Sequence, residues 1–403
     1  MKTKNKKFPR QGSAKPYGVL IVFLVILGLA ILGYFIYRGP AKPDEVISEN
    51  GAGVVPKVEI GPVAIPQKIL ENKFGFLSAG FDDYLFMNGV GAGWVRPHPG
   101  AFLWDAMQEN KGADYNFVNT DRAVKKYQEH NLAILATLWP FAEWDQKSRD
   151  GFDLCAVNEN DEFLLDITGK RGEEYIAQHR CAPMDWTAYT AWVKNVVERY
   201  DGDGNADMPG LKIPIKYWEV MNEPDLDGND RLDFWKDSAT AYAQLLVRTS
   251  AAIKEADPEA RVVIAGAAGG DKRFLDFYRS IFKQKEVIET FDIANVHCIS
   301  NDAYDSFNVE PYKKMLAEFK INKPIWVTEA EAIVSADMDV NATQTMKSAD
   351  KALSLGAERI FFTRYDFGTR GDLNDRPMMN VPLIKAEISG KDPEAAYKKI
   401  ISQ

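Results

Sequence analysis

From about residue 70 to its end, the chain alternates between short strand-like runs and longer helix-like segments. The strand-like runs are rich in β-branched and aromatic residues, which suit a pleated and buried surface. The helix-like segments repeat apolar residues at i, i+3, i+4 and i+7, as WTAYTAWVKNVVERY does at residues 186–200. Eight such alternations predict an α/β fold of the (β/α)8 TIM barrel type, in which the C-terminal ends of the strands form the active face. The predicted strands are residues 73–76, 92–97, 132–140, 215–223, 261–267, 291–297, 324–330 and 359–367.

An open, doubly wound sheet is the alternative architecture for alternating strands and helices. That fold usually binds a nucleotide at a glycine-rich turn that follows the first strand. The segment FGFLSAG, residues 74–80, does not have that spacing, and the glycines of GAGWVRP, residues 91–97, come before a strand. The sequence therefore favours the barrel.

Two of the predicted strands end in a glutamate. The run YWEVMNEPD, residues 217–225, reads as a buried strand that stops at Asn222, Glu223 and a proline. The run PIWVTEAEA, residues 324–332, ends a second strand at Glu329. Because the strands of a barrel open on the same face, we expect both side chains there. Two carboxyl groups roughly 5 Å apart are what retaining glycoside hydrolysis requires.

This arrangement resembles clan A of the glycoside hydrolases, which are retaining enzymes with a (β/α)8 barrel, and the chain is most similar to families 39 and 5 of that clan. The resemblance covers about residues 70–403 and rests on Asn-Glu-Pro after the fourth strand and on the second glutamate three strands later. It implies that Glu223 is the general acid/base, that Glu329 is the nucleophile, and that Asn222 binds the sugar 2-hydroxyl. Glu331 is an alternative nucleophile.

The resemblance also implies further pocket residues. Clan members often have an arginine after the second strand that keeps the nucleophile ionised, and a histidine at the end of the sixth strand; Arg96 and His297 match these positions. Ile299 stands where an aromatic residue is usual, and Tyr365 stands where a tryptophan usually forms the floor of the sugar site. The tryptophans at and after the end of the third strand offer stacking surfaces. Ordinary packing or ion pairing is the alternative for each residue. The candidate substrate-binding residues are Asn222, Arg96, His98, Trp139, Trp144, His297 and Tyr365.

The N-terminal part of the chain carries six lysines and arginines and no acid within residues 1–16, followed by an uncharged apolar run at 17–37. About twenty apolar residues in a helix cross a bilayer, and basic residues stay on the cytoplasmic side. We therefore expect a basic cytoplasmic tail, a single transmembrane anchor over 17–37, a linker over 38–67, and an extracytoplasmic catalytic domain over 68–403. A cleaved signal peptide is the alternative, although the apolar run exceeds the usual length and no clear cleavage site follows it.

The chain has three cysteines. Cys155 and Cys181 fall in one long predicted connection, and outside the cytoplasm they could form a disulfide. Cys298 reads as a small apolar residue of a buried strand. The cysteines and histidines show no spacing typical of a zinc site.

The loop after residues 186–200 carries oxygen-bearing side chains at alternate positions, which resembles the start of a calcium loop. Ala206 and Lys212 stand where an EF-hand has glycine and glutamate, so a solvated turn is the alternative. A structural calcium here would lie on the N-terminal face of the barrel and would stabilise rather than catalyse. The candidate ligands are Asp201, Asp203, Asn205 and Asp207. No other cofactor is expected.

The composition disfavours a nucleic-acid partner, because the net charge is −9 and no basic stripe lies outside the N-terminus. We interpret the chain as a membrane-anchored, extracytoplasmic retaining glycoside hydrolase that cleaves β-glycosidic bonds in an oligo- or polysaccharide. A transglycosylase would use the same residues. The alternative is a catalytically inactive barrel that binds cell-surface or extracellular polysaccharide, which the departures at Ile299 and Tyr365 favour and the glutamate pair disfavours. An unrelated lyase or aldolase would prefer a barrel-end lysine or a metal cluster, and neither stands out in the sequence.

Overall fold

The computed structural model describes residues 61–78, 84–98, 100–157, 176–226, 233–299, 304–335, 337–363, 367 and 393–402, all within one compact unit, Glu59–Gln403. The expected cytoplasmic tail, the expected membrane span at 17–37 and Tyr365 lie outside these residues. Within the described ranges, no helix is both long and apolar enough to cross a bilayer.

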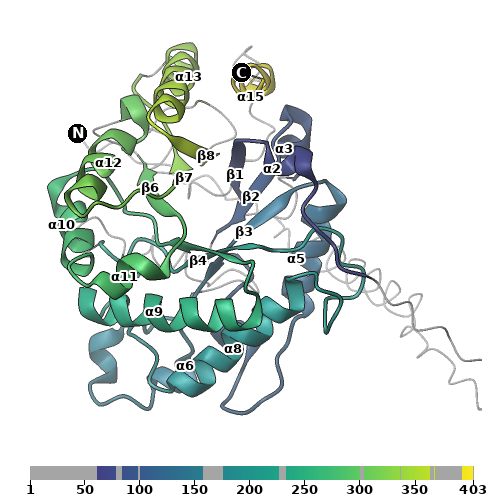
Figure 1. Ribbon diagram of the computed structural model, residues 1–403, viewed down its shortest axis with the longest axis vertical. Coiled ribbons are helices and arrows are strands. Elements are labelled where there is room, and N and C mark those ends of the chain that lie inside the picture. Colours follow the sequence, from purple (N-terminus) through teal and green to yellow (C-terminus); the bar gives the residue numbers. More distant parts are fainter. Residues whose placement is uncertain are drawn as a thin grey trace, which may run out of the picture. The chain divides into compact units, whose positions relative to one another are not determined.

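Eight parallel strands form one sheet in the order β5-β4-β3-β2-β1-β8-β7-β6. The two edge strands are joined by single bridges, Val263 to Ile293 and Ala267 to Val296. The sheet is therefore a nearly closed barrel, and all eight predicted strands are confirmed (Figure 1). The strands are β1 Phe74–Ser78, β2 Trp94–Pro97, β3 Ala133–Leu138, β4 Tyr217–Val220, β5 Arg261–Ile264, β6 Ala294–Cys298, β7 Ile325–Ala330 and β8 Ala357–Phe362.

Helices surround the strands, as a (β/α)8 fold requires (Figure 1). Helix α8, Trp186–Tyr200, has the predicted bounds. Asp185 caps its first turn by accepting a hydrogen bond from the Ala188 amide at 2.9 Å, a contact that stabilises a helix by about 1 kcal/mol. The apolar face of α8 is buried and packs against α9, Ala239–Ala256. The other helices are α2 Gln67–Leu70, α3 Tyr84–Val90, α4 Trp104–Met107, α5 Val118–Glu129, α6 Glu143–Gln146, α10 Lys272–Ile281, α11 Lys285–Thr290, α12 Val309–Glu318, α13 Met338–Ser354 and α15 Pro393–Ile401, with 3-10 turns η1 Phe152–Cys155 and η2 Tyr304–Ser306.

The N-terminal end of the barrel interior is apolar and closed. The Arg359 guanidinium lies over the rings of Trp94 and Trp326, 4.3 and 4.6 Å from their centroids, and donates a hydrogen bond to the Leu70 carbonyl at 2.7 Å. Helix α2 therefore covers this end. The apolar cluster consists of Ile65, Ile69, Trp94, Ala133, Leu135, Ile213, Val263, Ile293, Trp326 and Phe361. It includes Ile65, so the last residues of the expected linker pack on the barrel.

A buried polar layer lies next to this apolar cluster, toward the C-terminal ends of the strands. Side chains two residues apart on a strand face the same side, so Trp94 is followed inward by Arg96, and Trp326 by Thr328. The members of this layer come from six of the eight strands or from the residue just after one. They are Arg96, Thr137, Glu219, Asn295, Thr328 and Thr363. The layer is the platform on which the candidate active site stands.

The long connection between β3 and α8 contains a disulfide between Cys155 and Cys181, whose Cα atoms are 5.3 Å apart. The sequence left this pairing open. Cys298 is buried in β6, as expected, and its Sγ lies 3.8 Å from the Glu331 carbonyl.

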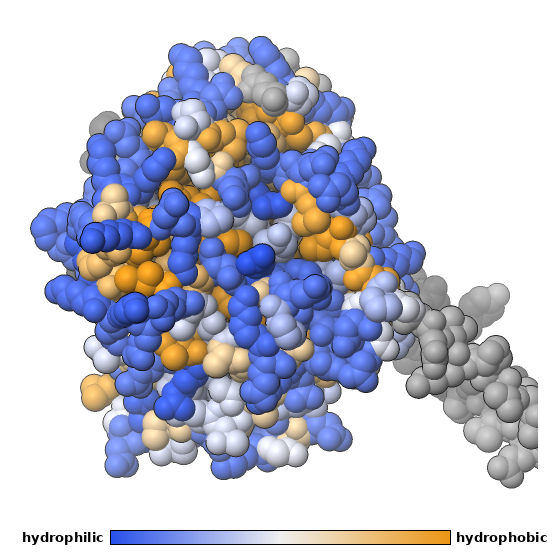
Figure 2. All heavy atoms as spheres, in the orientation of Figure 1, coloured by the Kyte–Doolittle hydropathy of each residue, from blue (hydrophilic) through white to orange (hydrophobic). Residues whose placement is uncertain are grey.

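Hydrophilic side chains dominate the face of the molecule drawn in Figure 2, with hydrophobic areas between them. The exposed large apolar residues of the described part of the chain come from separate elements rather than from one helix or strand. They are Leu85, Val118, Leu154, Met184, Val334 and Val340.

Candidate active site

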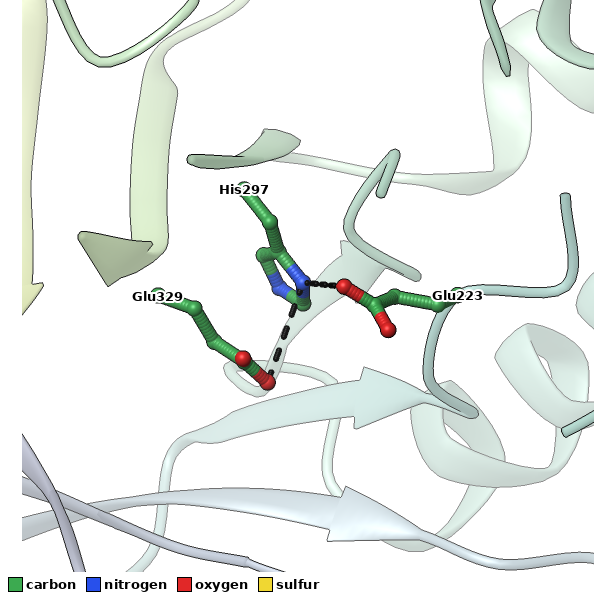
Figure 3. A group of neighbouring side chains, drawn as sticks. All are labelled: Glu223, His297 and Glu329. Carbon is green, nitrogen blue, oxygen red and sulfur yellow. Dashed lines mark hydrogen bonds and ion pairs between the residues drawn. The ribbon is translucent and has the colours of Figure 1, made fainter. Parts of the chain in front are cut away.

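Glu223 and Glu329 meet at the C-terminal end of the barrel. Glu329 belongs to β7, and Glu223 lies three residues beyond the end of β4. Both are buried, with 5% and 4% of their surfaces exposed. A carboxylate oxygen of one lies within 4.8 Å of a carboxylate oxygen of the other (Figure 3). This separation fits the roughly 5 Å of retaining glycosidases and is shorter than the roughly 6.5–9.5 Å of inverting ones.

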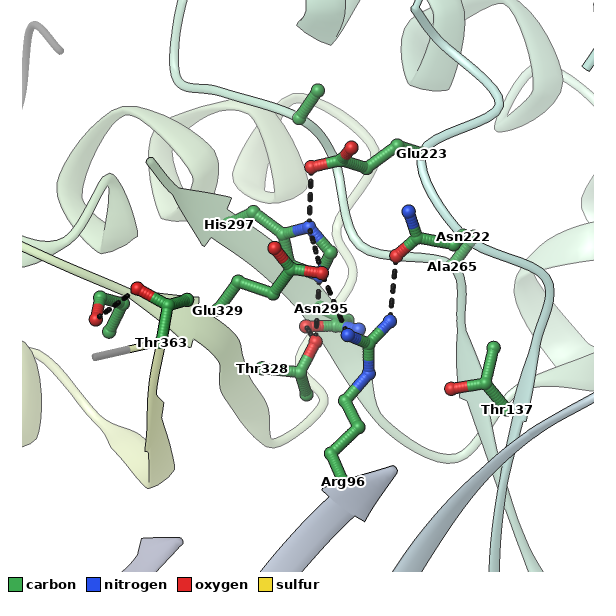
Figure 4. A network of polar contacts seen from close by, with 12 residues as sticks. Arg96, Thr137, Asn222, Glu223, Ala265, Asn295, His297, Thr328, Glu329 and Thr363 are labelled. Atoms are coloured by element: carbon green, nitrogen blue, oxygen red, sulfur yellow. Dashed lines mark hydrogen bonds and ion pairs between the residues drawn. The ribbon is translucent and has the colours of Figure 1, made fainter. Parts of the chain in front are cut away.

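The backbone after β4 differs from the predicted strand. We expected strand four to continue to Glu223, but β4 ends at Val220 because Met221 and Glu223 adopt positive φ angles of 70° and 38°. Such angles cost an L-residue on the order of 1–3 kcal/mol and persist only where the surroundings impose them. Here the Met221 amide donates to the Leu138 carbonyl at 3.1 Å. The turn brings the side chains of Asn222 and Glu223 into the same pocket (Figure 4).

Arg96 forms hydrogen bonds with side chains from β7 and from the end of β4, the two segments that carry the glutamates. Its guanidinium donates from Nε to Glu219 at 2.8 Å, from Nη1 to Glu329 at 2.7 Å, and from Nη2 to Asn222 Oδ1 at 2.7 Å. The side chain is completely buried, and its planar fork fixes the directions of all three bonds. The expected contact between Arg96 and the predicted nucleophile is therefore present, and Glu331 does not take part in these three bonds.

His297 lies between the two glutamates. Its Nδ1 is 2.7 Å from Glu223 Oε1 and 3.7 Å from Glu329 Oε1 (Figure 3). Its Nε2 is 2.8 Å from Thr328 Oγ1. The resemblance led us to expect His297 near the nucleophile, and it is near both acids. His297 lies two residues after Asn295 on β6 and faces the same side of the strand, and the pairing of β6 with β7 has a register shift between Val296 and His297.

Burial and neighbouring charges shift the pKa values of the titratable side chains in the site. Burial raises the pKa of the Glu223 carboxyl to about 7, against the opposing charge of Arg96. Burial also raises the pKa of Glu329, whereas His297 and Arg96 oppose this shift. Burial lowers the pKa of the His297 imidazole to about 4, so the ring is neutral near pH 7. A carboxyl group that is still protonated near pH 7, beside one that binds an arginine, is suited to acid catalysis.

The other predicted pocket residues have different environments. His98 is 5% exposed, and its Nδ1 has no hydrogen-bond partner among the described residues. Trp139 is fully buried against His98 and Phe234, at ring-centroid distances of 5.6 and 5.7 Å, so neither face of the ring is open for stacking. Trp144 is partly exposed and donates from Nε1 to the Gln108 carbonyl at 2.9 Å. Burial lowers the pKa of His98 well below its ordinary value, so this ring is neutral.

Several residues of the site were not predicted as functional. Glu219 accepts hydrogen bonds from Thr137 at 2.5 Å and from Asn295 at 2.7 Å. Thr328 lies between Asn295 and His297 (Figure 4). The signal available in the sequence was the even offset of Glu219 from Glu223, which places both side chains on the same side of a regular strand.

Among the residues that the structure describes, two groups of side chains have the geometry of a cation site. Glu223, His297 and Glu329 form one, but the positive Arg96 guanidinium binds Glu329 at 2.7 Å and disfavours a second cation there. Asp201, Asp203 and Asp207 form the other. In that loop Asp207 accepts from the amides of two neighbouring glycines, and Asn205 donates to Glu198. These bonds hold the loop in place, and the carboxylates of Asp201, Asp203 and Asp207 keep the spacing of a cation site, so the structural calcium and the solvated turn both stay predictions.

Gly266 provides the space for the His297 ring. A Cβ at this position would lie 2.1 Å from His297 Nε2, closer than any real contact. We therefore expect Gly266→Ala to push the imidazole away from Glu223 and to lower kcat/KM at least tenfold, with an overpacking cost of about 1–3 kcal/mol. Steady-state kinetics and thermal unfolding measure the two effects. Gly75→Ala is the control, because its Cβ would meet Phe361 and Trp94 instead of His297; equal activity loss in both variants would contradict this role.

The sequence matches one family of enzymes over just over half of its length. Residues 170–379 match the model of the family described as glycosyl hydrolase catalytic core. The matched segment contains β4 to β8 and both glutamates. None of the curated proteins matches the chain in sequence.

Solved structures share the barrel. A glucosidase from Croceicoccus marinus has a TM-score of 0.56 and 15% identity, covering 85% of this chain and 68% of that chain. A GH39 enzyme from Xanthomonas axonopodis pv. citri has a TM-score of 0.53 and 16% identity, covering 85% and 67%. Native xylanase 10B from Thermotoga maritima has a TM-score of 0.50 and 15% identity, covering 84% and 98%. At these identities the likeness shows a common fold.

Proposed function

The chain belongs to the glycosyl hydrolase catalytic core family, and from this membership we propose that it cleaves β-glycosidic bonds with retention of configuration by a two-glutamate mechanism. The observation that carries the mechanism is the distance between the two carboxylates, whose oxygens approach within 4.8 Å. This space accommodates a sugar C1 between nucleophile and acid but leaves too little room for the water that an inverting enzyme places there.

In the first step Glu329 attacks the anomeric carbon while Glu223 donates its proton to the departing glycosidic oxygen. The bond between C1 and that oxygen breaks, and a covalent ester between C1 and Glu329 forms. The hydrogen bond from Arg96 Nη1 leaves Glu329 Oε2 available for attack and favours the ionised form of the group.

In the second step the ionised Glu223 removes a proton from water, which attacks C1 and releases Glu329. Glu223 is then protonated again, as the next cycle requires. The raised pKa of about 7 suits this exchange, because the group can hold and release a proton near neutral pH.

Polar atoms around the pair support a sugar as the ligand. Asn222 Oδ1 is fixed by Arg96, which directs Nδ2 away, and this Nδ2 is buried without a partner among the described residues. Asp225 Oδ1 and His98 Nδ1 are also buried without a hydrogen-bond partner among the described residues. A buried polar atom without a partner costs about 1–3 kcal/mol, and a sugar hydroxyl would satisfy each of these atoms.

We test this function by screening the full-length protein on aryl β-glycosides and on β-linked polysaccharides, with Glu329→Gln as the blank. Turnover that is absent from the blank supports the proposal and identifies the sugar. Polysaccharide binding that is equal in both proteins, without turnover, would instead favour the inactive binding barrel. The observation that favours this second function is Ile299, an aliphatic residue at the position where an aromatic residue is usual.

For the location of the enzyme, we propose a single membrane anchor at residues 17–37 with the barrel outside the cytoplasm. The support is the uncharged apolar run preceded by six basic residues. We expect the full chain to sediment with membranes through carbonate washing, and a chain without residues 1–37 to remain in the supernatant. Release of the full chain with a newly processed N-terminus would contradict the anchor and favour a cleaved signal peptide.

A further inference from the structure

Thr328 has one hydroxyl hydrogen and three polar neighbours. Its Oγ1 lies 2.9 Å from Asn295 Oδ1, 3.3 Å from Glu219 Oε1 and 2.8 Å from His297 Nε2. The amide orientation of Asn295 is set by its other end, where Nδ2 donates to Glu219 at 2.7 Å. Asn295 Oδ1 and the Glu219 carboxylate can only accept, so the Thr328 hydrogen points to one of them.

The remaining contact then has a defined direction. Because the hydroxyl hydrogen of Thr328 is already used, its oxygen accepts a hydrogen from His297 Nε2. His297 is neutral and carries a single ring hydrogen, which leaves Nδ1 with a lone pair. Nδ1 is 2.7 Å from Glu223 Oε1, so the hydrogen between them belongs to the Glu223 carboxyl group.

We propose that Thr328 is a positioning residue for the acid/base: by accepting the Nε2 hydrogen of His297, it makes Nδ1 the acceptor that holds the proton of Glu223 until a glycosidic oxygen takes it. The proposal rests on Glu223 acting as the acid/base. No covalent bond forms or breaks in this arrangement, and the proton remains on the Glu223 carboxyl group. With the other tautomer, Nδ1–H would donate to Glu223 and favour its ionised form.

Other charged or titratable groups also face this pair. They are Arg96 from β2, His98 after β2, Glu219 from β4, Asp225 after β4 and Glu329 from β7. Their charges act on Glu223 in both tautomers of His297. The direction of the bond at Nε2 selects between the tautomers, and Thr328 makes that bond. Substitution of Thr328 should therefore change the tautomer while the surrounding charges stay in place.

The chain offers a matched control. Thr137 and Thr328 are both fully buried. Thr137 Oγ1 donates a hydrogen bond to Glu219 at 2.5 Å, and Thr328 Oγ1 lies 3.3 Å from the same carboxylate. Thr328 also contacts His297, whereas the Thr137 hydroxyl donates its hydrogen bond to Glu219. Valine at either position keeps the shape and removes the hydroxyl. A general effect of losing a buried hydroxyl would appear in both variants.

The first readout is the tautomer of His297, measured by ¹⁵N NMR of the full-length protein labelled at histidine. The chain contains four histidines, and His297→Gln identifies the relevant signals. We expect the Nε2–H form in the wild-type protein and in Thr328→Ser and Thr137→Val, and a population of the Nδ1–H form in Thr328→Val. An Nδ1–H form in the wild-type protein would overturn the inference, whether or not the protein hydrolyses glycosides.

The second readout is the dependence of kcat/KM on pH, with the sugar that the screen identifies. We expect the basic limb of Thr328→Val to move to lower pH by about one unit, because Glu223 then ionises more readily. Thr328→Ser should restore the wild-type limb, and Thr137→Val should keep it. Equal shifts in the two valine variants would overturn the inference. If Thr328→Val does not fold, Thr328→Ala removes the same hydroxyl and takes its place in both measurements.

Discussion

Replacement of Glu329 by alanine is expected to lower kcat/KM by about 10⁴-fold or more while the protein remains folded. The expected loss is large because the carboxylate forms the covalent bond to C1, and no other group of the described site is placed to do so. Glu329 Oε1 lies 2.7 Å from Arg96, and its carboxylate lies within 4.8 Å of Glu223. Circular dichroism and thermal unfolding check the fold, since Arg96 retains Glu219 as a partner in the variant.

Glu331 provides the matched control for this substitution. It is a buried glutamate just past the end of β7, and it was the alternative nucleophile in the sequence. Its Oε2 lies 3.4 Å from Thr363 Oγ1, away from the three bonds of Arg96. We expect Glu331→Ala to keep activity within about tenfold of the wild-type value. If Glu331→Ala were inactive and Glu329→Ala active, Glu331 would be the nucleophile and Glu329 would not.

Replacement of Glu223 by alanine is expected to have an effect that depends on the leaving group. General acid catalysis contributes about 10²–10⁴-fold, so natural glycosides with poor leaving groups should lose that factor in kcat/KM. Activated aryl glycosides need little acid and should lose far less in the first step. Azide, which needs no general base, should attack the glycosyl-enzyme and restore turnover of these substrates as the glycosyl azide.

The pH profile provides a second check on Glu223. Its pKa is raised to about 7, and the acid works only when protonated, so wild-type kcat/KM should fall as pH rises through about 7. The alanine variant should lose this basic limb on activated substrates. A Glu223→Ala variant that keeps the limb and loses the same factor on every leaving group would show that another residue is the acid.

The barrel could be predicted from the sequence because the pattern that specifies each strand and helix is local. Each strand is a short apolar run, and the helix at residues 186–200 carries both its apolar periodicity and its capping Asp185 in the sequence. The strand ends were less accurate where the backbone is irregular. The positive φ angles of Met221 and Glu223 depend on contacts with other strands, which no local pattern contains.

The glutamate pair could also be predicted, since both residues follow from strand ends that open on one face, and the resemblance to clan A implied Arg96 beside them. Thr328 could not, because the expected inward direction of Glu329 would turn its neighbour outward. The structure has an irregular register between Val327 and Ala330, which lets adjacent residues face the site. Trp139 was predicted as a stacking surface because it ends a strand, but the ring is covered by His98 and Phe234.

The stereochemistry of the reaction tests the account most directly. Proton NMR can follow the anomeric signal of the first product as a β-glycoside is hydrolysed, before mutarotation mixes the anomers. The separation of Glu223 and Glu329 predicts that the β-anomer appears first. First appearance of the α-anomer would mean direct attack by water and would contradict the role of Glu329 as a covalent nucleophile.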